Sequence, residues 1–86
     1  MMLVLLAAGC SDCRSACLPV EECRLDSLSA CVRKCKQMEA RARQVGREEE
    51  YRRWLNCLEN LDRRTRRQCK MSYFQCRRQV APELFR

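Results

Sequence analysis

Histidine is absent from this 86-residue chain, and glycine, proline and aromatic residues are scarce. Without histidine, neither a Cys-His nor a Ser-His catalytic pair can form, and a metalloprotease helix motif is impossible. The two glycines, Gly9 and Gly46, cannot make a glycine-rich phosphate loop. These absences exclude the commonest hydrolytic and nucleotide-dependent activities. The sequence therefore predicts a protein that is not an enzyme and needs no cofactor.

Signals for β-strands are also missing. No segment alternates apolar and polar residues, and no Asn-Gly or Asp-Gly pair marks a hairpin turn. A chain this short forms one small domain and buries only a modest fraction of its surface, so its hydrophobic core alone leaves it marginally stable. We therefore expect an all-α fold with additional cross-links.

Cysteine, by contrast, is abundant. The chain has nine cysteines, a content above the roughly 8–10 % that indicates a disulfide scaffold in a short chain. Zinc ligation is the competing interpretation, but the only Cys-x2-Cys is Cys10 to Cys13 and no second such pair completes a site. The composition therefore predicts disulfides, an oxidising compartment and no bound metal.

The first nine residues are uncharged and mostly apolar, and polarity rises abruptly after them. Nine residues are too few for a membrane-spanning helix, which needs about 20, but they match the apolar part of a signal peptide. Residues 6–10, Leu-Ala-Ala-Gly-Cys, resemble a bacterial lipoprotein signal, which implies that Cys10 is lipidated and becomes the mature N-terminus. Lipidation of Cys10 would leave eight cysteines, enough for four bridges without a free thiol. The alternative is that residues 1–9 begin a buried helix.

Apolar residues recur at helical spacing after residue 27, where Asp26 or Ser27 can cap a helix. The first stripe consists of Leu28, Cys31, Cys35, Met38, Ala42 and Val45. It stops at Gly46, a residue suited to a helix C-cap or a tight turn. We therefore predict a helix over residues 28–45.

A second stripe starts in a shifted phase beyond Gly46. It consists of Tyr51, Leu55, Leu58, Leu61 or Asp62, Thr65, Cys69, Tyr73, Cys76 and Val80. This spacing predicts a single second helix over residues 48–80, ending before Pro82. Packing of Tyr51 and Trp54 in the core between the two helices is the preferred role for these aromatic residues.

The resulting prediction divides the chain into four parts. Residues 1–9 form a signal-like leader, residues 10–26 a cysteine-rich segment of short helical pieces with Pro19 in a first helical turn, residues 27–80 a hairpin, and residues 81–86 a tail. The fold class is an all-α, disulfide-stapled antiparallel helical hairpin with a short helical N-terminal segment.

An antiparallel hairpin centred on Gly46 brings together residues whose numbers sum to about 92. This geometry pairs Cys35 with Cys57, Cys23 with Cys69 and Cys17 with Cys76, and it leaves Cys13 with Cys31. Eight cysteines allow 105 connectivities, so other pairings stay open.

Two Cys-x3-Cys pairs, Cys13/Cys17 and Cys31/Cys35, indicate a different arrangement. Cysteines four residues apart lie on one helix face, so two such pairs on antiparallel helices can form two rungs. Here the sequence resembles the twin Cys-x3-Cys and Cys-x9-Cys proteins of the mitochondrial intermembrane space. These are oxidised helical hairpins that act as import chaperones, assembly factors or accessory subunits of respiratory complexes. The resemblance implies that Cys13 pairs with Cys35 and Cys17 with Cys31.

The net charge of +7 is unevenly distributed: residues 10–30 are net acidic, whereas residues 31–86 are strongly basic. Such asymmetry favours an acidic partner or an anionic surface, although a solvated arginine-rich helix face would look the same. The densest basic residues are Arg63, Arg64, Arg66, Arg67, Lys70, Arg77 and Arg78. Aromatic residues are too few for base stacking, so nucleic acid is not the expected partner.

Taken together, these features predict a small cell-envelope lipoprotein on the periplasmic or outer side of a membrane. Its expected contacts are membrane lipid, through Cys10, and a protein partner or complex in which it has a structural or adaptor role. The alternative is an intermembrane-space hairpin protein that serves as an assembly factor or accessory subunit. The two hypotheses share fold and redox chemistry, and they differ in the fate of Cys10.

Overall fold

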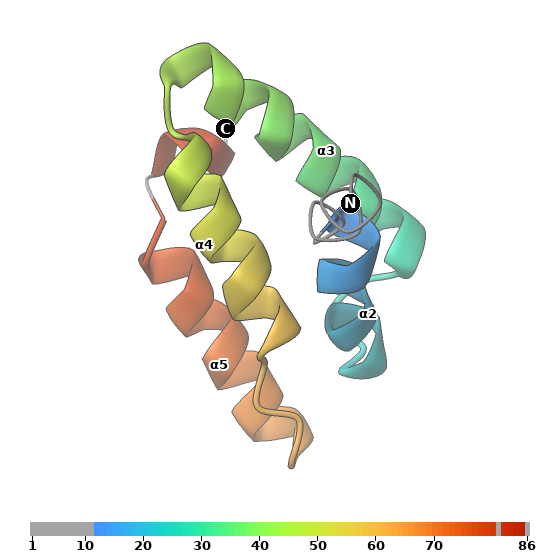
Figure 1. Cartoon of the computed structure of the whole chain (residues 1–86). Coiled ribbons are helices and arrows are strands. Elements are labelled where there is room, and N and C mark those ends of the chain that lie inside the picture. The colour runs from blue at the N-terminus through green and yellow to red at the C-terminus, as the bar shows by residue number, and fades with distance from the viewer. Residues whose placement is uncertain (1–11, 81, 86) are drawn as a thin grey trace, which may run out of the picture.

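The computed structural model describes residues 12–80 and 82–85, and this part of the chain is all-α (Figure 1). Four α-helices follow one another, with a short 3-10 helix after them. They are α2 (Cys13–Glu22), α3 (Leu28–Val45), α4 (Glu48–Glu59), α5 (Arg66–Arg78) and η1 (Pro82–Phe85). The expected leader and Cys10 lie outside the described residues.

Helix α2 is one continuous helix. Its N-cap is Asp12, whose carboxylate accepts a hydrogen bond from the backbone N–H of Ser15 at 3.0 Å. The prediction of short helical pieces, with Pro19 in a first turn, is wrong, because Pro19 lies inside the helix. Proline there removes one backbone donor. Its ring is buried, and α2 contributes Ala16, Cys17 and Val20 to the core.

Helix α3 has the predicted bounds and ends at the predicted residue. Ser27 caps its start by accepting a hydrogen bond from the N–H of Ala30, and Gly46 caps its end with φ +71°. This left-handed conformation is costly for any residue that carries a Cβ atom, so glycine is favoured at this position. Of the predicted stripe, Cys35, Met38 and Ala42 are buried, whereas Val45 is 44 % exposed.

The predicted second helix over residues 48–80 is two helices, so that prediction is wrong. The chain leaves α4 at Asn60, runs through a loop and re-enters a helix at Arg66. Thr65 caps α5 by accepting a hydrogen bond from the N–H of Gln68 at 3.0 Å. Figure 1 shows α5 returning alongside α4 after this loop.

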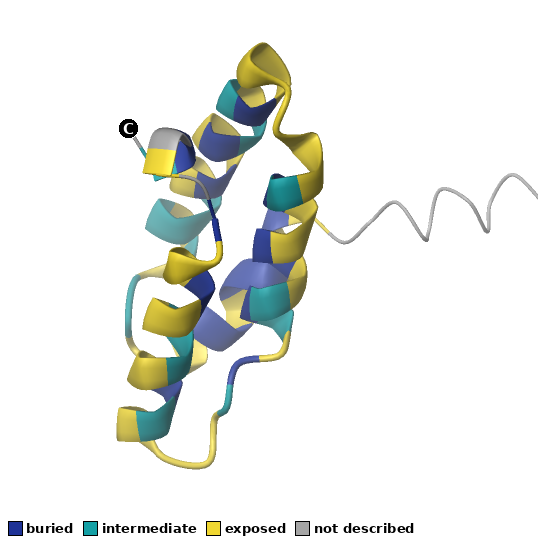
Figure 2. Ribbon diagram, turned by 90° about the vertical axis from the view of Figure 1, so that its left-hand side faces the viewer, coloured by how far each residue is buried: buried dark blue, intermediate teal, exposed yellow. Residues whose placement is uncertain are grey.

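The core is centred on α4, which packs against α2, α3 and α5. Tyr51, Trp54, Leu55 and Leu58 make up its buried face, which confirms the predicted core role of Tyr51 and Trp54. The outward faces of the helices are exposed (Figure 2). Their amphipathic pattern explains how so short a chain assembles four helices around one centre.

Four disulfides link the helices and use all eight cysteines between residues 13 and 76. The pairs are Cys13–Cys35, Cys17–Cys31, Cys23–Cys69 and Cys57–Cys76. Their Cα–Cα distances of 5.6–6.3 Å lie within the ordinary range for a disulfide. The first two pairs are those implied by the resemblance to twin Cys-x3-Cys proteins, and Cys23–Cys69 is the pair predicted from the hairpin geometry.

The other predicted rungs, Cys35 with Cys57 and Cys17 with Cys76, and the leftover pair Cys13 with Cys31, are wrong. Helices α3 and α4 spread apart from Gly46 (Figure 1), and α2 packs against both of them. Helix α2 therefore supplies the partners of Cys31 and Cys35, while Cys57 bonds across to α5.

The segment that the sequence set apart as a C-terminal tail contributes to the core. Within η1, Leu84 is 3 % exposed, and the ring of Phe85 meets Trp54 edge to face at 5.1 Å between centroids. Because η1 also packs against α3, the C-terminal residues connect α3 with the central helix α4.

Candidate functional site

The chain offers two candidate surfaces, a basic face on α5 and a groove between α3 and α5. The α5 sequence contains five basic residues and no Asp or Glu. Arg66, Lys70 and Phe74 follow one another at four-residue spacing, and Arg67 and Met71 form the adjacent row. We call this surface the α5 basic face; it consists of Arg66, Arg67, Lys70, Met71, Phe74, Arg77 and Arg78, and all seven residues are exposed.

The α5 basic face combines positive charge with exposed apolar side chains. Phe74 is 49 % exposed and Met71 is 55 % exposed, in a small protein with few such residues. None of Arg66, Arg67 and Lys70 makes an ion pair within the described part of the chain. Their charge is therefore available to an external anion, while Phe74 can enter an apolar layer beside it.

Two predicted patch residues lie in the α4–α5 loop and are already paired. Arg63 binds Glu22 of α2 at 2.8 Å, and Arg64 binds Asp62 at 2.8 Å. Arg64 lowers the pKa of Asp62 to about 2. The main cause is that its guanidinium donates hydrogen bonds to the carboxylate, and the second is that its backbone N–H does the same. Because Arg63 and Arg64 are paired within the protein and lie outside α5, the other five of the seven predicted basic residues make up the charged part of the α5 basic face.

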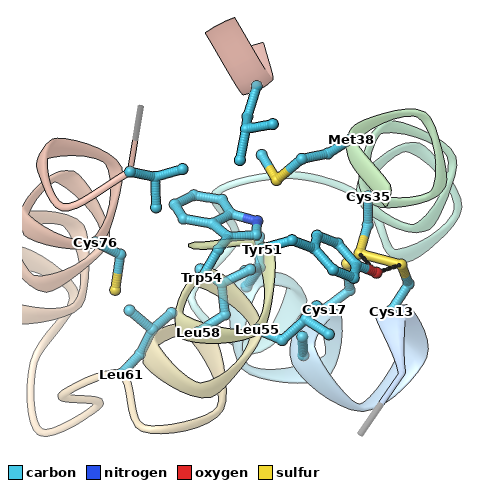
Figure 3. Packing of buried hydrophobic residues seen from close by; sticks show 14 of the residues in the cluster. Cys13, Cys17, Cys35, Met38, Tyr51, Trp54, Leu55, Leu58, Leu61 and Cys76 are labelled. Atoms are coloured by element: carbon cyan, nitrogen blue, oxygen red, sulfur yellow. Dashed lines mark hydrogen bonds between the residues drawn. A yellow bond between two sulfur atoms is a disulfide. The ribbon is translucent and has the colours of Figure 1, made fainter. Parts of the chain in front are cut away.

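The groove has a volume of about 530 Å³ and lies between α3 on one side and α5 with η1 on the other. Helix α4 forms its floor with Trp54 and Leu58. Trp54 lies between Met38 of α3 and Cys76 of α5 (Figure 3). Its ring also meets Tyr73 of α5 edge to face at 5.8 Å between centroids. The floor is thus an aromatic and aliphatic surface assembled from three helices.

The rim of the groove is mainly basic. Lys34 and Arg41 stand on the α3 wall, Arg77 stands on the α5 wall, and Asp26 is the one acidic residue among the described lining residues. Lys34 binds Asp26 at 3.0 Å, and this hydrogen bond is the main reason that the Asp26 pKa is lowered. The guanidinium of Arg77 lies 4.6 Å from the centre of the Phe85 ring.

Tyr51 is the most strongly perturbed group in the core. Its hydroxyl lies 3.2 Å from the Cys13 sulfur and 3.5 Å from the Cys35 sulfur (Figure 3). Those sulfurs form a disulfide and carry no hydrogen, so the phenol donates. Burial raises the pKa of Tyr51 to about 12, with a smaller contribution from Glu39. This contact secures α4 to the first rung between α2 and α3.

Sequence reasoning found the basic residues of α5 but not the groove. Met38, Trp54 and Tyr73 were assigned to stripes or to core packing, and no spacing rule joins residues of three helices with Leu84 of η1. The described residues contain no cluster of three potential metal ligands, and no helix among them is long and apolar enough to cross a membrane.

Comparisons of the chain with protein-family models, with curated proteins and with solved structures found no match. Conclusions about its function therefore come from its own residues.

Proposed function

We propose that this protein is a membrane-anchored lipoprotein of the cell envelope whose disulfide-stapled helices act as a structural or adaptor component of a protein assembly. The observation that carries the proposal is the cysteine pairing. The four bridges among residues 13–76 use eight of the nine cysteines, which leaves Cys10 without an intramolecular partner. Cys10 is also the residue that follows the signal-like stretch Leu6-Ala7-Ala8-Gly9.

The α5 basic face supports a location beside an anionic surface. A helix with several unpaired cations and an exposed Phe suits an interface where headgroups are negative and the acyl layer is close. A lipid anchor on Cys10 would hold the domain at such a surface and raise the effective concentration of this second, weaker contact. In this arrangement the rest of the domain remains available to a partner protein.

An intermembrane-space role is the second candidate, and one observation favours it. Cys13–Cys35 and Cys17–Cys31 are the rungs implied by the resemblance to twin Cys-x3-Cys proteins. On this alternative the protein is an assembly factor or an accessory subunit of a respiratory complex. Cys10 would then carry no lipid and would be a free thiol or bonded to another chain.

The experiment compares the full-length protein with its Cys10→Ser variant in a bacterial host. Membrane and soluble fractions are separated, and the intact mass of each form is measured. We expect the native form in the membrane fraction with the added mass of its acyl chains. The Cys10→Ser variant should be soluble and retain all four bridges, since none of them involves Cys10.

Equal partitioning of the two forms, or an unlipidated native mass, would refute the lipoprotein proposal in favour of the intermembrane-space alternative. Cys17→Ser is the matched control. It also removes one sulfur, but it breaks the Cys17–Cys31 bridge and should leave lipidation intact.

A further inference from the structure

We propose that the groove between α3 and α5 binds a single-chain amphiphile with a carboxylate head group, that is, a fatty acid. This inference concerns the groove, which shares only Arg77 with the α5 basic face, and it does not depend on the proposed anchoring at Cys10. It rests on the size of the groove, the character of its floor, and the charge of its rim.

The groove has the dimensions and lining of a small-molecule site. Its volume of about 530 Å³ falls within the range of roughly 300–1,000 Å³ that is typical of ligand pockets. Met38, Trp54, Leu58 and Leu84 supply an apolar floor. The partly exposed rings of Tyr73 and Phe85 line the walls above this floor, and a hydrocarbon chain placed between the walls would leave water, which favours binding.

The depth of the floor favours a slender occupant over a protein surface. Met38 and Trp54 are each 5 % exposed and Leu58 is 1 % exposed, so these residues offer no surface to a flat protein partner. A flat protein partner would instead meet protruding apolar residues. The exposed large apolar side chains of the described region lie elsewhere, and none of them lines the groove: Leu18, Val45, Met71 and Phe74.

The rim selects a negative head group. Arg41 on the α3 wall is partly buried and makes no ion pair with any described residue, so its guanidinium can form a bidentate contact with a carboxylate. Arg77 stands on the opposite wall, where its contact with Phe85 restricts it. Lys34 is partly neutralised by Asp26, which makes Arg41 and Arg77 the main candidates for the head-group site.

Trp54, the single tryptophan of the chain, reports directly on this site. Laurate is titrated, at concentrations where it is monomeric, into the soluble Cys10→Ser protein with its four disulfides intact, and Trp54 fluorescence is followed. We expect a saturable change with laurate. Dodecanol and dodecyltrimethylammonium have the same chain length but a neutral and a cationic head, and we expect them to bind at least about tenfold more weakly.

Charge reversals then locate the head group. Arg41→Glu and Arg77→Glu should each raise the dissociation constant for laurate about tenfold or more. Lys36→Glu is the matched control, because Lys36 is an exposed residue of α3 that does not line the groove. It should leave laurate binding almost unchanged, and circular dichroism should show the same helix content in all three variants.

Three results would overturn the proposal. The first is the absence of a saturable Trp54 response to laurate. The second is equal binding of dodecanol and laurate. The third is equal weakening by Arg41→Glu, Arg77→Glu and Lys36→Glu, since that pattern would reflect net charge alone. Each result can occur whether Cys10 is lipidated or not.

Discussion

At the scale of single residues, Tyr51 joins the disulfide network to the aromatic core. Its hydroxyl donates toward the Cys13–Cys35 bridge, while its ring belongs to the buried face of α4. A phenol in this position is stable only when it is neutral, because a phenolate would lose hydration and face sulfur atoms that cannot donate to it. The side chain therefore makes stability depend on pH in the alkaline range.

We predict that stability falls as the pH rises from about 10 to about 12. The pKa of Tyr51 is 10.0 when unperturbed and about 12 in the folded protein. Between these values the unfolded chain has released the phenol proton and the folded chain has kept it, so unfolding is favoured as pH increases. Below pH 10 this residue contributes no pH dependence.

Ultraviolet absorbance of the phenolate measures this titration directly. A Tyr73→Phe background leaves Tyr51 as the only tyrosine, and its absorbance should rise only near pH 12 while the protein stays folded. The Tyr51→Phe variant is the stability control, and its unfolding free energy should be less dependent on pH in that range. A Tyr51 midpoint near pH 10 in the folded protein would contradict the prediction.

At the scale of helices, the α5 basic face should recognise anionic membranes without the lipid anchor. We predict that the soluble Cys10→Ser form binds vesicles rich in phosphatidylglycerol and not vesicles of phosphatidylcholine alone. Reversal of two charges, Arg67→Glu with Lys70→Glu, should abolish most of this binding. Co-sedimentation with vesicles at low and high salt measures it.

The matched control is Lys36→Glu with Arg52→Glu. Both residues are exposed, neither lies on α5, and the double change alters net charge by the same amount. This control should bind nearly as well as the parent, whereas equal losses in both double variants would show that net charge, not the α5 basic face, governs binding. Phe74→Ala should weaken binding without changing its salt dependence.

We predict that the Cys23–Cys69 bridge stabilises the fold more than the Cys17–Cys31 bridge does. It joins residues 46 positions apart, whereas Cys17–Cys31 joins residues 14 apart. On the chain-entropy model, the longer loop adds about 1 kcal/mol to the stabilisation. Replacing Cys23 and Cys69 by Ala should therefore lower the unfolding free energy more than replacing Cys17 and Cys31.

Denaturant unfolding without reductant measures both double variants. Each pair contains one fully buried cysteine, Cys69 or Cys17, while Cys23 is 9 % exposed and Cys31 is partly buried. A greater loss for the Cys17/Cys31 variant would mean that local strain or packing, not loop closure, decides the effect.

Much of the helical architecture could be predicted from the sequence. The apolar stripe of α3 and its end at Gly46 were sufficient to predict the bounds of this helix, because the stripe changes phase at the same place where a glycine occurs. The loop after α4 was missed because Leu61 and Thr65 keep the helical spacing across it, although the capping pattern of Thr65 with Gln68 was present. Apolar spacing alone does not distinguish a continuous helix from a break that preserves phase.

The disulfide pairing shows why the hairpin arithmetic failed. It assumed a constant helical rise on both sides of Gly46, but the chain between Asn60 and Thr65 is not helical. The loop instead reverses the direction of the chain, so that α5 runs back alongside α4 (Figure 1) and Cys57 meets Cys76. The groove was unpredictable for a related reason, since it exists only once α3, α4, α5 and η1 have been placed relative to one another.

At the scale of the whole molecule, the core is small and sulfur-rich. Among the described residues, 17 apolar residues are buried, and six of them are cysteines. The larger side chains that remain are Val20, Met38, Tyr51, Trp54, Leu55, Leu58, Leu61, Val80 and Leu84. Nine such residues cannot offset the conformational entropy of a chain this long by a wide margin, so the cross-links are needed for stability.

Complete reduction should therefore unfold the protein at room temperature or bring it close to unfolding. Each bridge contributes about 2–4 kcal/mol, and the loss of all four exceeds the stability expected of a domain of this size. Reduction would also remove the covalent links that hold α2 against α3 and α4 against α5.

Circular dichroism should show loss of helix as reductant is added, and Trp54 fluorescence should shift to the red as water reaches the ring. Reoxidation should restore both signals, which provides the control for irreversible damage. A reduced protein that keeps its helix content, its Trp54 emission and its melting temperature would show that packing alone maintains the fold.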